Sequence, residues 1–207
     1  MALTIAIAPH PTLEVGAFVA RFPRPLCEVV AQLDPGVLTT VSAGETVRAE
    51  IRQLLRHGGF KPAGRSKPAS EYLVAAHAEG RWPHINAAVD ACNLASLRSG
   101  LPISVVDLDR VVGSLEIKVC PPGTSYVFNP SGQVIDASGL IALFDAEGPS
   151  GTPVKDAQRT KTHDDTRAAL SIVWGSKQLS TTHEATSWYR QLVASIPGTT
   201  LEDVVLA

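Results

Sequence analysis

The sequence predicts an α+β fold in which mostly antiparallel strands form sheets and helices pack on them. Short alternating or apolar runs, separated by turns rich in Pro and Gly, occur at both ends and in the middle of the chain, which is typical of short strands. Other segments repeat apolar residues at helical spacing. With 207 residues, 44% of them hydrophobic, the chain is long and apolar enough to bury one core. We therefore expect one domain over residues 1–207.

The N-terminal part predicts two strands, an irregular link and a helix. Leu3–Ala8 and Val15–Phe22 are short apolar runs that a His-Pro pair separates, which predicts two strands joined by a turn. Prolines at positions 23, 25 and 35 exclude a regular helix from the link, although Cys27–Leu33 could form a turn or two. From Gly44 to Gly59, apolar residues recur at helical spacing until two glycines end the run.

Two further helices follow. Ser66–Glu79 has an apolar side and an acidic first turn. Glu71 in that turn either complements the positive end of the helix dipole or has a role in a site, and the first interpretation is at least as good as the second. The next helix has both ends specified by sequence. Asn86 is a good N-cap, and Gly100 followed by a proline is a typical stop. A strand to Asp109 comes after it.

The C-terminal half predicts a meander of strands, a long loop and a terminal helix. The expected strands are Ser114–Val119, Ser125–Phe128, Val134–Asp136, Leu140–Asp145 and Ala168–Trp174, with an edge strand at Leu201–Leu206. The polar loop from Gly148 to Asp165 is too long to serve only as a connection. Thr181–Ser195 predicts the last helix.

Asn86, Asp90 and Asn93 lie on one stripe of a helix that is otherwise apolar nearly all round. Polar groups on a buried helix need partners. These three side chains either line a pocket, or Asn86 caps the helix while the other two hold neighbouring loops. Both interpretations stay open.

The residues of this helix and its surroundings resemble the B3/B4 domain, the editing and tRNA-associated domain of the phenylalanyl-tRNA synthetase beta subunit, which also occurs as freestanding proteins. The matching residues are Trp82-Pro83-His84-Ile85-Asn86, Val89-Asp90, Asn93, Ser96-Leu97, Leu101-Pro102-Ile103 and Asp107. Ser70-Glu71, Pro153-Val154-Lys155-Asp156 and Arg159-Thr160-Lys161-Thr162 look like the freestanding branch. The resemblance covers roughly Arg65 to Trp174.

The resemblance implies hydrolysis of the ester that joins a wrong amino acid to the 3′ end of a tRNA. This chain departs from the synthetase at two places. Ser104 stands where the synthetase strand usually carries a histidine, and the glutamate that helps to hold the noncognate side chain has no clear counterpart in Val154–Thr162. The synthetase's editing residues are therefore not simply transferable.

The candidate site residues come from the long loop and the signature helix and strand. As catalytic residues we expect Asp156, Lys161 and Thr162, because an aminoacyl ester needs only a positioned water and donors for the oxyanion. As substrate-binding residues we expect Asn86, Asp90, Asn93, Ser104, Asp107, Lys155 and Thr160. A solvated charged loop, which also contains Arg159, is the competing interpretation.

Several polar residues have equally simple explanations. Asp107 and Asp109 could orient a water or an ammonium group, or close a turn. His84 and His163 could act as general bases, although a lone histidine is more often a surface or core residue.

Basic residues concentrate between Gly44 and Lys67, a segment that contains six Lys or Arg residues and only two acidic residues. They are Arg48, Arg52, Arg56, Lys61, Arg65 and Lys67. An RNA backbone could use this stripe, but in a chain of net charge -2 we favour a solvated helix face.

Other features limit the function classes. No nucleotide-binding loop, paired-cysteine site, metalloprotease motif or nucleophile elbow occurs, so we expect no cofactor, no metal and no aminoacylating activity. Cys27, Cys92 and Cys120 are predicted to be buried and free. The chain shows no signal peptide or membrane span, and we expect a soluble cytoplasmic protein that binds neither membrane nor DNA.

Two functions of different class remain. The first is a freestanding deacylase that acts in trans on mischarged aminoacyl-tRNA. The second is a pocket that binds a free amino acid or a similar molecule without hydrolysis. A plain tRNA-binding module is a third candidate, which the acidic balance of the chain disfavours. The sequence predicts no oligomeric state.

Overall fold

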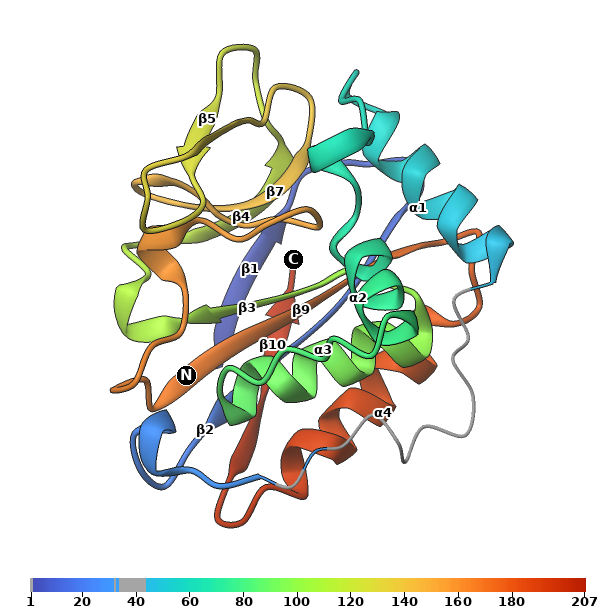
Figure 1. Cartoon of the computed structure of the whole chain (residues 1–207). Coiled ribbons are helices and arrows are strands. Elements are labelled where there is room, and N and C mark those ends of the chain that lie inside the picture. The colour runs from blue at the N-terminus through green and yellow to red at the C-terminus, as the bar shows by residue number, and fades with distance from the viewer. Residues whose placement is uncertain (1, 32, 34–43) are drawn as a thin grey trace.

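The computed structural model describes residues 2–31, 33 and 44–207, and an eight-stranded sheet forms its centre (Figure 1). The order of strands across the sheet is β3 (Ile103–Asp107), β9 (Ala168–Ser176), β2 (Leu13–Arg21), β10 (Thr200–Leu206), β1 (Leu3–Ile7), β4 (Leu115–Val119), β7 (Ile141–Asp145) and β8 (Gly148–Gly151). β1 runs parallel to both of its neighbours, and all other neighbouring strands in this sheet are antiparallel. The predicted α+β class is confirmed.

Four helices are described: α1 (Glu45–Arg56), α2 (Ala69–Ala78), α3 (Ala87–Ser99) and α4 (Thr182–Ala194). α3 packs on β3 and lies between α2 and α4, and α4 also packs on β2 and β9 (Figure 1). Ala88, Ala91 and Ala95 are buried on α3, and their small side chains let its neighbours approach closely. None of the described helices has the length and apolarity that a membrane crossing requires.

β9 is the strand on which the site depends. All nine of its residues are buried, and it pairs with β2 on one side and β3 on the other. Gly16 of β2 and Gly175 of β9 bring α4 close to the sheet, because an added Cβ would lie 1.9 Å and 2.1 Å from threonine hydroxyls of α4. A larger residue at either glycine would push the helix away.

The order of strands corrects two predictions about the ends of the chain. β1 and β2 are not a hairpin, because β10 lies between them. β10 is consequently an interior strand rather than an edge strand. These pairings join residues about two hundred positions apart, such as Leu3 with Val204, and no local pattern reports such a neighbour.

Three other predictions need correction. β5 (Ser125–Val127) and β6 (Val134–Asp136) form a separate two-stranded sheet outside the meander. The loop from Gly148 starts with strand β8 and contains a 3-10 turn at Gln158–Thr160, so it is more ordered than expected. Cys27 is exposed, because it lies in a surface 3-10 turn, whereas the other two cysteines are buried as predicted. The helix-breaking role of Pro35 lies outside the described residues.

Candidate functional site

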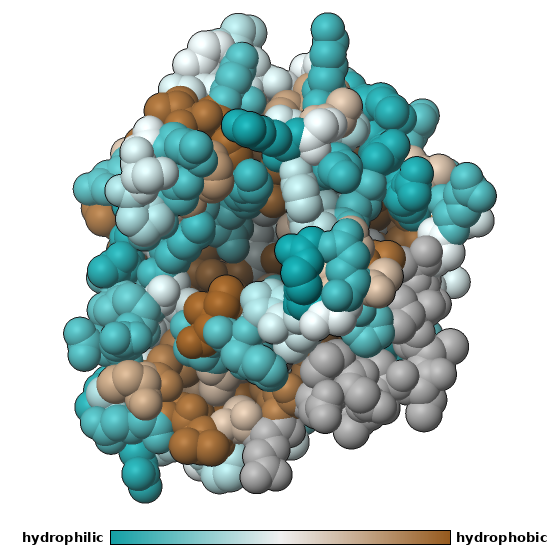
Figure 2. Space-filling view, in the orientation of Figure 1, coloured by the Kyte–Doolittle hydropathy of each residue, from teal (hydrophilic) through white to brown (hydrophobic). Residues whose placement is uncertain are grey.

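The connector, residues 152–162, lies beside β3 and reaches the N-terminal end of α3. Asn86 Nδ2 donates to Thr162 Oγ1 over 3.2 Å, and Val105 N of β3 donates to Asp156 Oδ2 over 3.3 Å. The space-filling view shows a recess between α3 and the part of the chain built from β4 to β8 (Figure 2). The connector and the signature helix thus lie on the same side of the molecule.

Asp156 is the acidic residue of the connector, and its pKa is shifted strongly. Its Oδ1 accepts a hydrogen bond from Thr152 N over 2.9 Å, and Val105 N holds Oδ2. Protein atoms crowd the carboxyl group, yet the residue keeps some accessible surface. Burial raises the pKa of Asp156 to about 6, although these hydrogen bonds and nearby Lys161 act in the opposite direction.

Lys161 of the connector lies near this carboxyl group, whereas Lys155 lies beside aromatic rings. Lys161 is partly buried, its Nζ donates to Phe128 O over 2.5 Å, and its backbone bridges Val106 of β3. Burial lowers the pKa of Lys161, while the charge of Asp156 raises it. Lys155 Nζ lies 4.2 Å from the ring centre of Phe128, and burial followed by the charge of Arg65 lowers its pKa. The connector therefore places one cation near the Asp156 carboxyl group and a second one beside aromatic rings.

The polar stripe of α3 divides into two kinds of residue. Asn86 caps the helix, since its side chain accepts from Val89 N over 3.0 Å, and also holds Thr162. Asp90 accepts from Ile85 N over 2.9 Å and contacts His84 Nδ1 at 3.3 Å, so it fixes the entry to the helix. Asn93 is partly buried, and its side chain has no hydrogen-bond partner within the described chain. Asn93 thus has free donors and acceptors.

Other predicted site residues are committed to the fold. The Thr160 hydroxyl is fully buried and donates to Ser150 O over 2.9 Å. Ser104 Oγ accepts from Trp174 Nε1 over 2.9 Å and donates to Thr152 O over 3.1 Å. Asp107 is also fully buried. These three residues position the connector or its surroundings rather than face a ligand.

Arg159 of the connector serves the scaffold. It forms two hydrogen bonds of 2.8 and 2.6 Å with Asp145, whose side chain is 0% exposed, and it also donates to two carbonyls of β8. A buried carboxylate requires such a partner. The competing interpretation of the connector as a solvated charged loop therefore fails at Arg159.

A model of the B3/4 domain family matches residues 64–188, which is more than half of the chain. The chain belongs to the B3/4 domain family. The matched residues include α3, β3, the connector and the first part of α4, so the recess is built within the B3/4 domain.

The fold of this B3/4 domain protein is similar to that of a solved N-terminal fragment of the phenylalanyl-tRNA synthetase beta-subunit from Pyrococcus horikoshii. The TM-score is 0.51 at 12% sequence identity, over 99% of this chain and 52% of the other. At this identity the likeness shows the fold alone, and the chain spans about half the length of that fragment. Among curated proteins, no sequence matches this chain.

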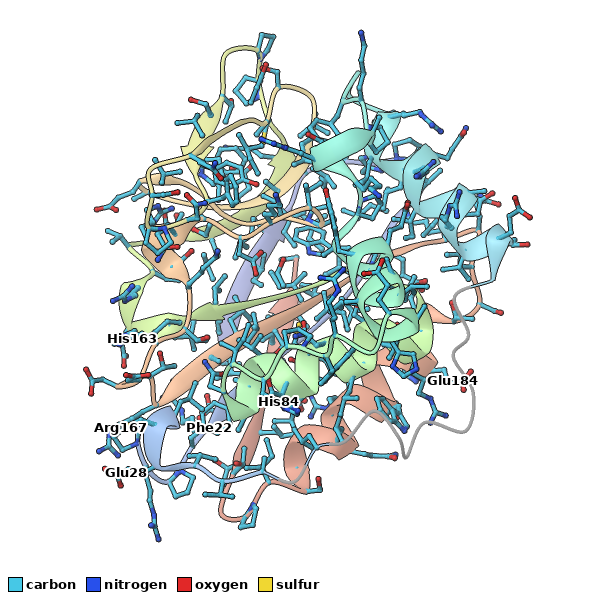
Figure 3. The ribbon with its side chains drawn as sticks, in the orientation of Figure 1. Phe22, Glu28, His84, His163, Arg167 and Glu184 are labelled. Carbon is cyan, nitrogen blue, oxygen red and sulfur yellow. The ribbon has the colours of Figure 1, made fainter. Side chains whose placement is uncertain are left out.

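The two histidines near the B3/4 signature lie at separate places (Figure 3). His84 is exposed beside α3, where it contacts Asp90. His163 Nε2 lies 3.1 Å from Asp107 Oδ2, and Asp165 N donates to its Nδ1 over 3.3 Å. Thr166 Oγ1 also donates to Asp107, over 2.5 Å. Both ring nitrogens of His163 thus have partners, which disfavours it as a general base.

The basic residues of this B3/4 domain protein do not form one free stripe. Arg52 is bound to Glu71 through two hydrogen bonds of 2.7 Å, and Arg48 lies 4.0 Å from the same carboxylate. Glu71 therefore acts in an ion pair. Lys61, Arg65 and Arg56 are exposed and form no ion pair with any described residue, and Lys67 lies 5.1 Å from the ring centre of Tyr72.

A groove of about 740 Å³ collects part of this positive charge next to two aromatic rings. Arg65, Tyr72, Phe128 and Lys155 are among its lining residues. Aromatic rings between cations are typical of surfaces that bind single-stranded nucleic acid. Tyr72 and Phe128 were not predicted as site residues, because they lie 56 positions apart in the sequence.

Proposed function

We propose that this B3/4 domain protein hydrolyses mischarged aminoacyl-tRNA in trans, with the aminoacyl ester bound in the recess between α3 and the connector. The family and the fold relate the chain to a domain of a tRNA synthetase. The observation that supports hydrolysis is the buried carboxyl group of Asp156, which has a pKa of about 6 and lies near Lys161. Perturbed pairs of this kind are typical of functional sites.

The proposed reaction uses Asp156 as general base. Its carboxylate takes a proton from a water molecule while the water oxygen attacks the ester carbonyl carbon. The Lys161 ammonium stabilises the oxyanion that forms. Collapse of the tetrahedral intermediate breaks the bond to the ribose oxygen, which receives the proton from Asp156. The products are the free amino acid and the uncharged tRNA end.

Other residues of α3, the connector and the groove have binding roles in this proposal. Asn93 offers an amide to the amino group or carbonyl of the substrate, because no described residue uses its side chain. The Thr162 hydroxyl, which Asn86 holds, can orient the attacking water. The groove of Arg65, Tyr72, Phe128 and Lys155 suits the unpaired end of the tRNA. An aminoacyl-tRNA substrate implies work in the cytoplasm.

A second candidate is a non-catalytic binder of an amino acid or a tRNA 3′ end. The observation that favours it is that both reactive groups already have partners: Asp156 accepts two backbone N–H groups, and Lys161 donates to Phe128 O. Lys161 must give up this carbonyl, or share its other N–H groups, to act on an ester.

The deciding experiment is deacylation of tRNAs charged with a panel of amino acids, measured as release of labelled amino acid. The deacylase proposal predicts release above the buffer rate for at least one charged tRNA, with a loss of at least tenfold in Asp156→Asn and in Lys161→Met. Arg81→Met, at an exposed cation outside the recess, is the control and should retain the rate. Absence of release would contradict the deacylase proposal, and thermal stabilisation by a free amino acid would then support the non-catalytic binder.

A further inference from the structure

A second cavity lies at the other end of α3, where it meets the start of α4. Its volume is about 200 Å³, which is below the roughly 300–1,000 Å³ of sites for drug-sized ligands. Ala95, Arg98 and Ser99 line it from α3 and Thr181, Glu184, Ala185 and Trp188 from the other side. The space suits one small metabolite.

The cavity carries two opposite charges that do not pair with each other. Arg98 and Glu184 form no hydrogen bond or ion pair with each other or with any other described residue. The guanidinium group of Arg98 instead lies 4.5 Å from the ring centre of Trp188, which holds it in place. Glu184 lies in the first turn of α4, and Figure 3 shows it far from His84 at the opposite end of α3.

Two further features complete the polar lining. Thr181 Oγ1 is buried and has no hydrogen-bond partner. An unpaired buried hydroxyl of this kind lowers the stability of the fold. Thr181 is also the residue before α4, so the unpaired N–H groups of the first turn lie close by.

We propose that this cavity binds a free α-amino acid as its zwitterion, at a site separate from the recess. Arg98 binds the carboxylate, because its planar group offers two parallel N–H donors to two oxygens. Glu184 binds the ammonium group. Trp188 and the two alanines contact the aliphatic part of the side chain.

Both charges are needed to select this ligand class. A simple anion would leave Glu184 facing negative charge, and an amine would leave Arg98 facing positive charge. A zwitterion satisfies both side chains, and the small volume limits the ligand to a single amino acid. The inference does not depend on hydrolysis in the recess, since no lining residue of the cavity belongs to that site.

The test is isothermal titration of the full chain with a panel of free L-amino acids at neutral pH. Two truncated probes, 4-methylpentanoate without the ammonium group and 3-methylbutylamine without the carboxylate, accompany L-leucine. The proposal predicts saturable binding of at least one amino acid, weakened at least tenfold by Arg98→Gln and by Glu184→Gln. Glu184→Gln should leave binding of 4-methylpentanoate unchanged or improved, because only the carboxylate partner remains. Arg56→Gln and Glu28→Gln, at exposed positions outside the cavity, are the controls.

The outcomes separate this site from the recess. Binding that survives both Arg98→Gln and Glu184→Gln, or that Asn93→Ala and Asp156→Ala abolish instead, would overturn the proposal, as would absence of binding to every amino acid. If Arg98→Gln does not fold, the exposed Glu184 decides alone. If the wild type deacylates tRNA, the same rate in Glu184→Gln would show that the two sites act independently; if it does not, the titration still tests this cavity alone.

Discussion

At the scale of single residues, Asp156 has surroundings that favour its protonated form. Burial raises its pKa from 3.8 to about 6. The folded state therefore binds this proton more tightly than the unfolded state does, so the contribution of Asp156 to stability is complete below the unfolded pKa and is lost as the pH rises through about 6.

We predict that the free energy of unfolding of the wild type falls, relative to Asp156→Asn, as the pH rises from about 4 to about 7. A shift of roughly two units at about 1.4 kcal/mol each sets an upper limit of about 3 kcal/mol. Urea denaturation of both proteins across this range measures the difference. Parallel stability curves would mean that Asp156 has an ordinary pKa.

The sequence predicted residue types better than residue roles. Asp156 and Lys161 were selected because charged and hydroxyl groups crowd the connector, and the structure places the two side chains near each other. Thr160 and Ser104 belong to the same segments but are 0% exposed. The exposure of these side chains depends on the path of the connector, which contacts with other elements fix. For example, Tyr126 OH of β5 donates to Lys155 O over 2.6 Å. No spacing in the sequence reports this contact.

At the scale of elements, α3 was the most predictable part of the molecule, because its signals are local. Asn86 caps the start as expected, and Gly100 at its end has the left-handed conformation, with φ of 74°. The predicted bounds of the four described helices agree with the structure to within a few residues. Hydrophobic spacing and caps suffice for helices, whereas strand partners are set by contacts between distant segments.

We predict that the two asparagines of α3 differ in their effects. Asn86→Ala removes a helix cap and the bond to Thr162, so it should lower the free energy of unfolding by about 1 kcal/mol. Asn93→Ala removes no described hydrogen bond and should change stability by less than about 0.5 kcal/mol while it weakens substrate binding. Thermal denaturation and the KM for deacylation measure the two effects. A larger stability loss in Asn93→Ala would assign it to the scaffold.

At the scale of the whole molecule, β10 joins the two ends of the chain. It pairs with β1 and β2, so strands near the N-terminus depend on the last residues. We predict a single cooperative unfolding transition for residues 1–207, seen at the same denaturant concentration by circular dichroism and by tryptophan fluorescence. Two separated transitions would divide the chain into more than one domain.

The charge distribution leads to a prediction for tRNA binding. Arg65 and Lys67 keep their charges available, whereas Arg52 is bound to Glu71. Arg65→Ala and Lys67→Ala should each reduce the slope of log affinity against log salt by about 0.7, the value expected for one contact to a single strand. Arg52→Ala should leave the slope unchanged and lower stability. Filter binding between about 50 and 200 mM salt measures the slopes.

The most direct test of the proposed function is the pH dependence of single-turnover deacylation. The carboxylate form of Asp156 is the base, so the rate should rise with pH through a midpoint near its pKa of about 6 and level off above it. Asp156→Asn should lose this rise together with most of the rate. A rate that does not change between about pH 5 and pH 8, or a rise that persists in Asp156→Asn, would contradict the account.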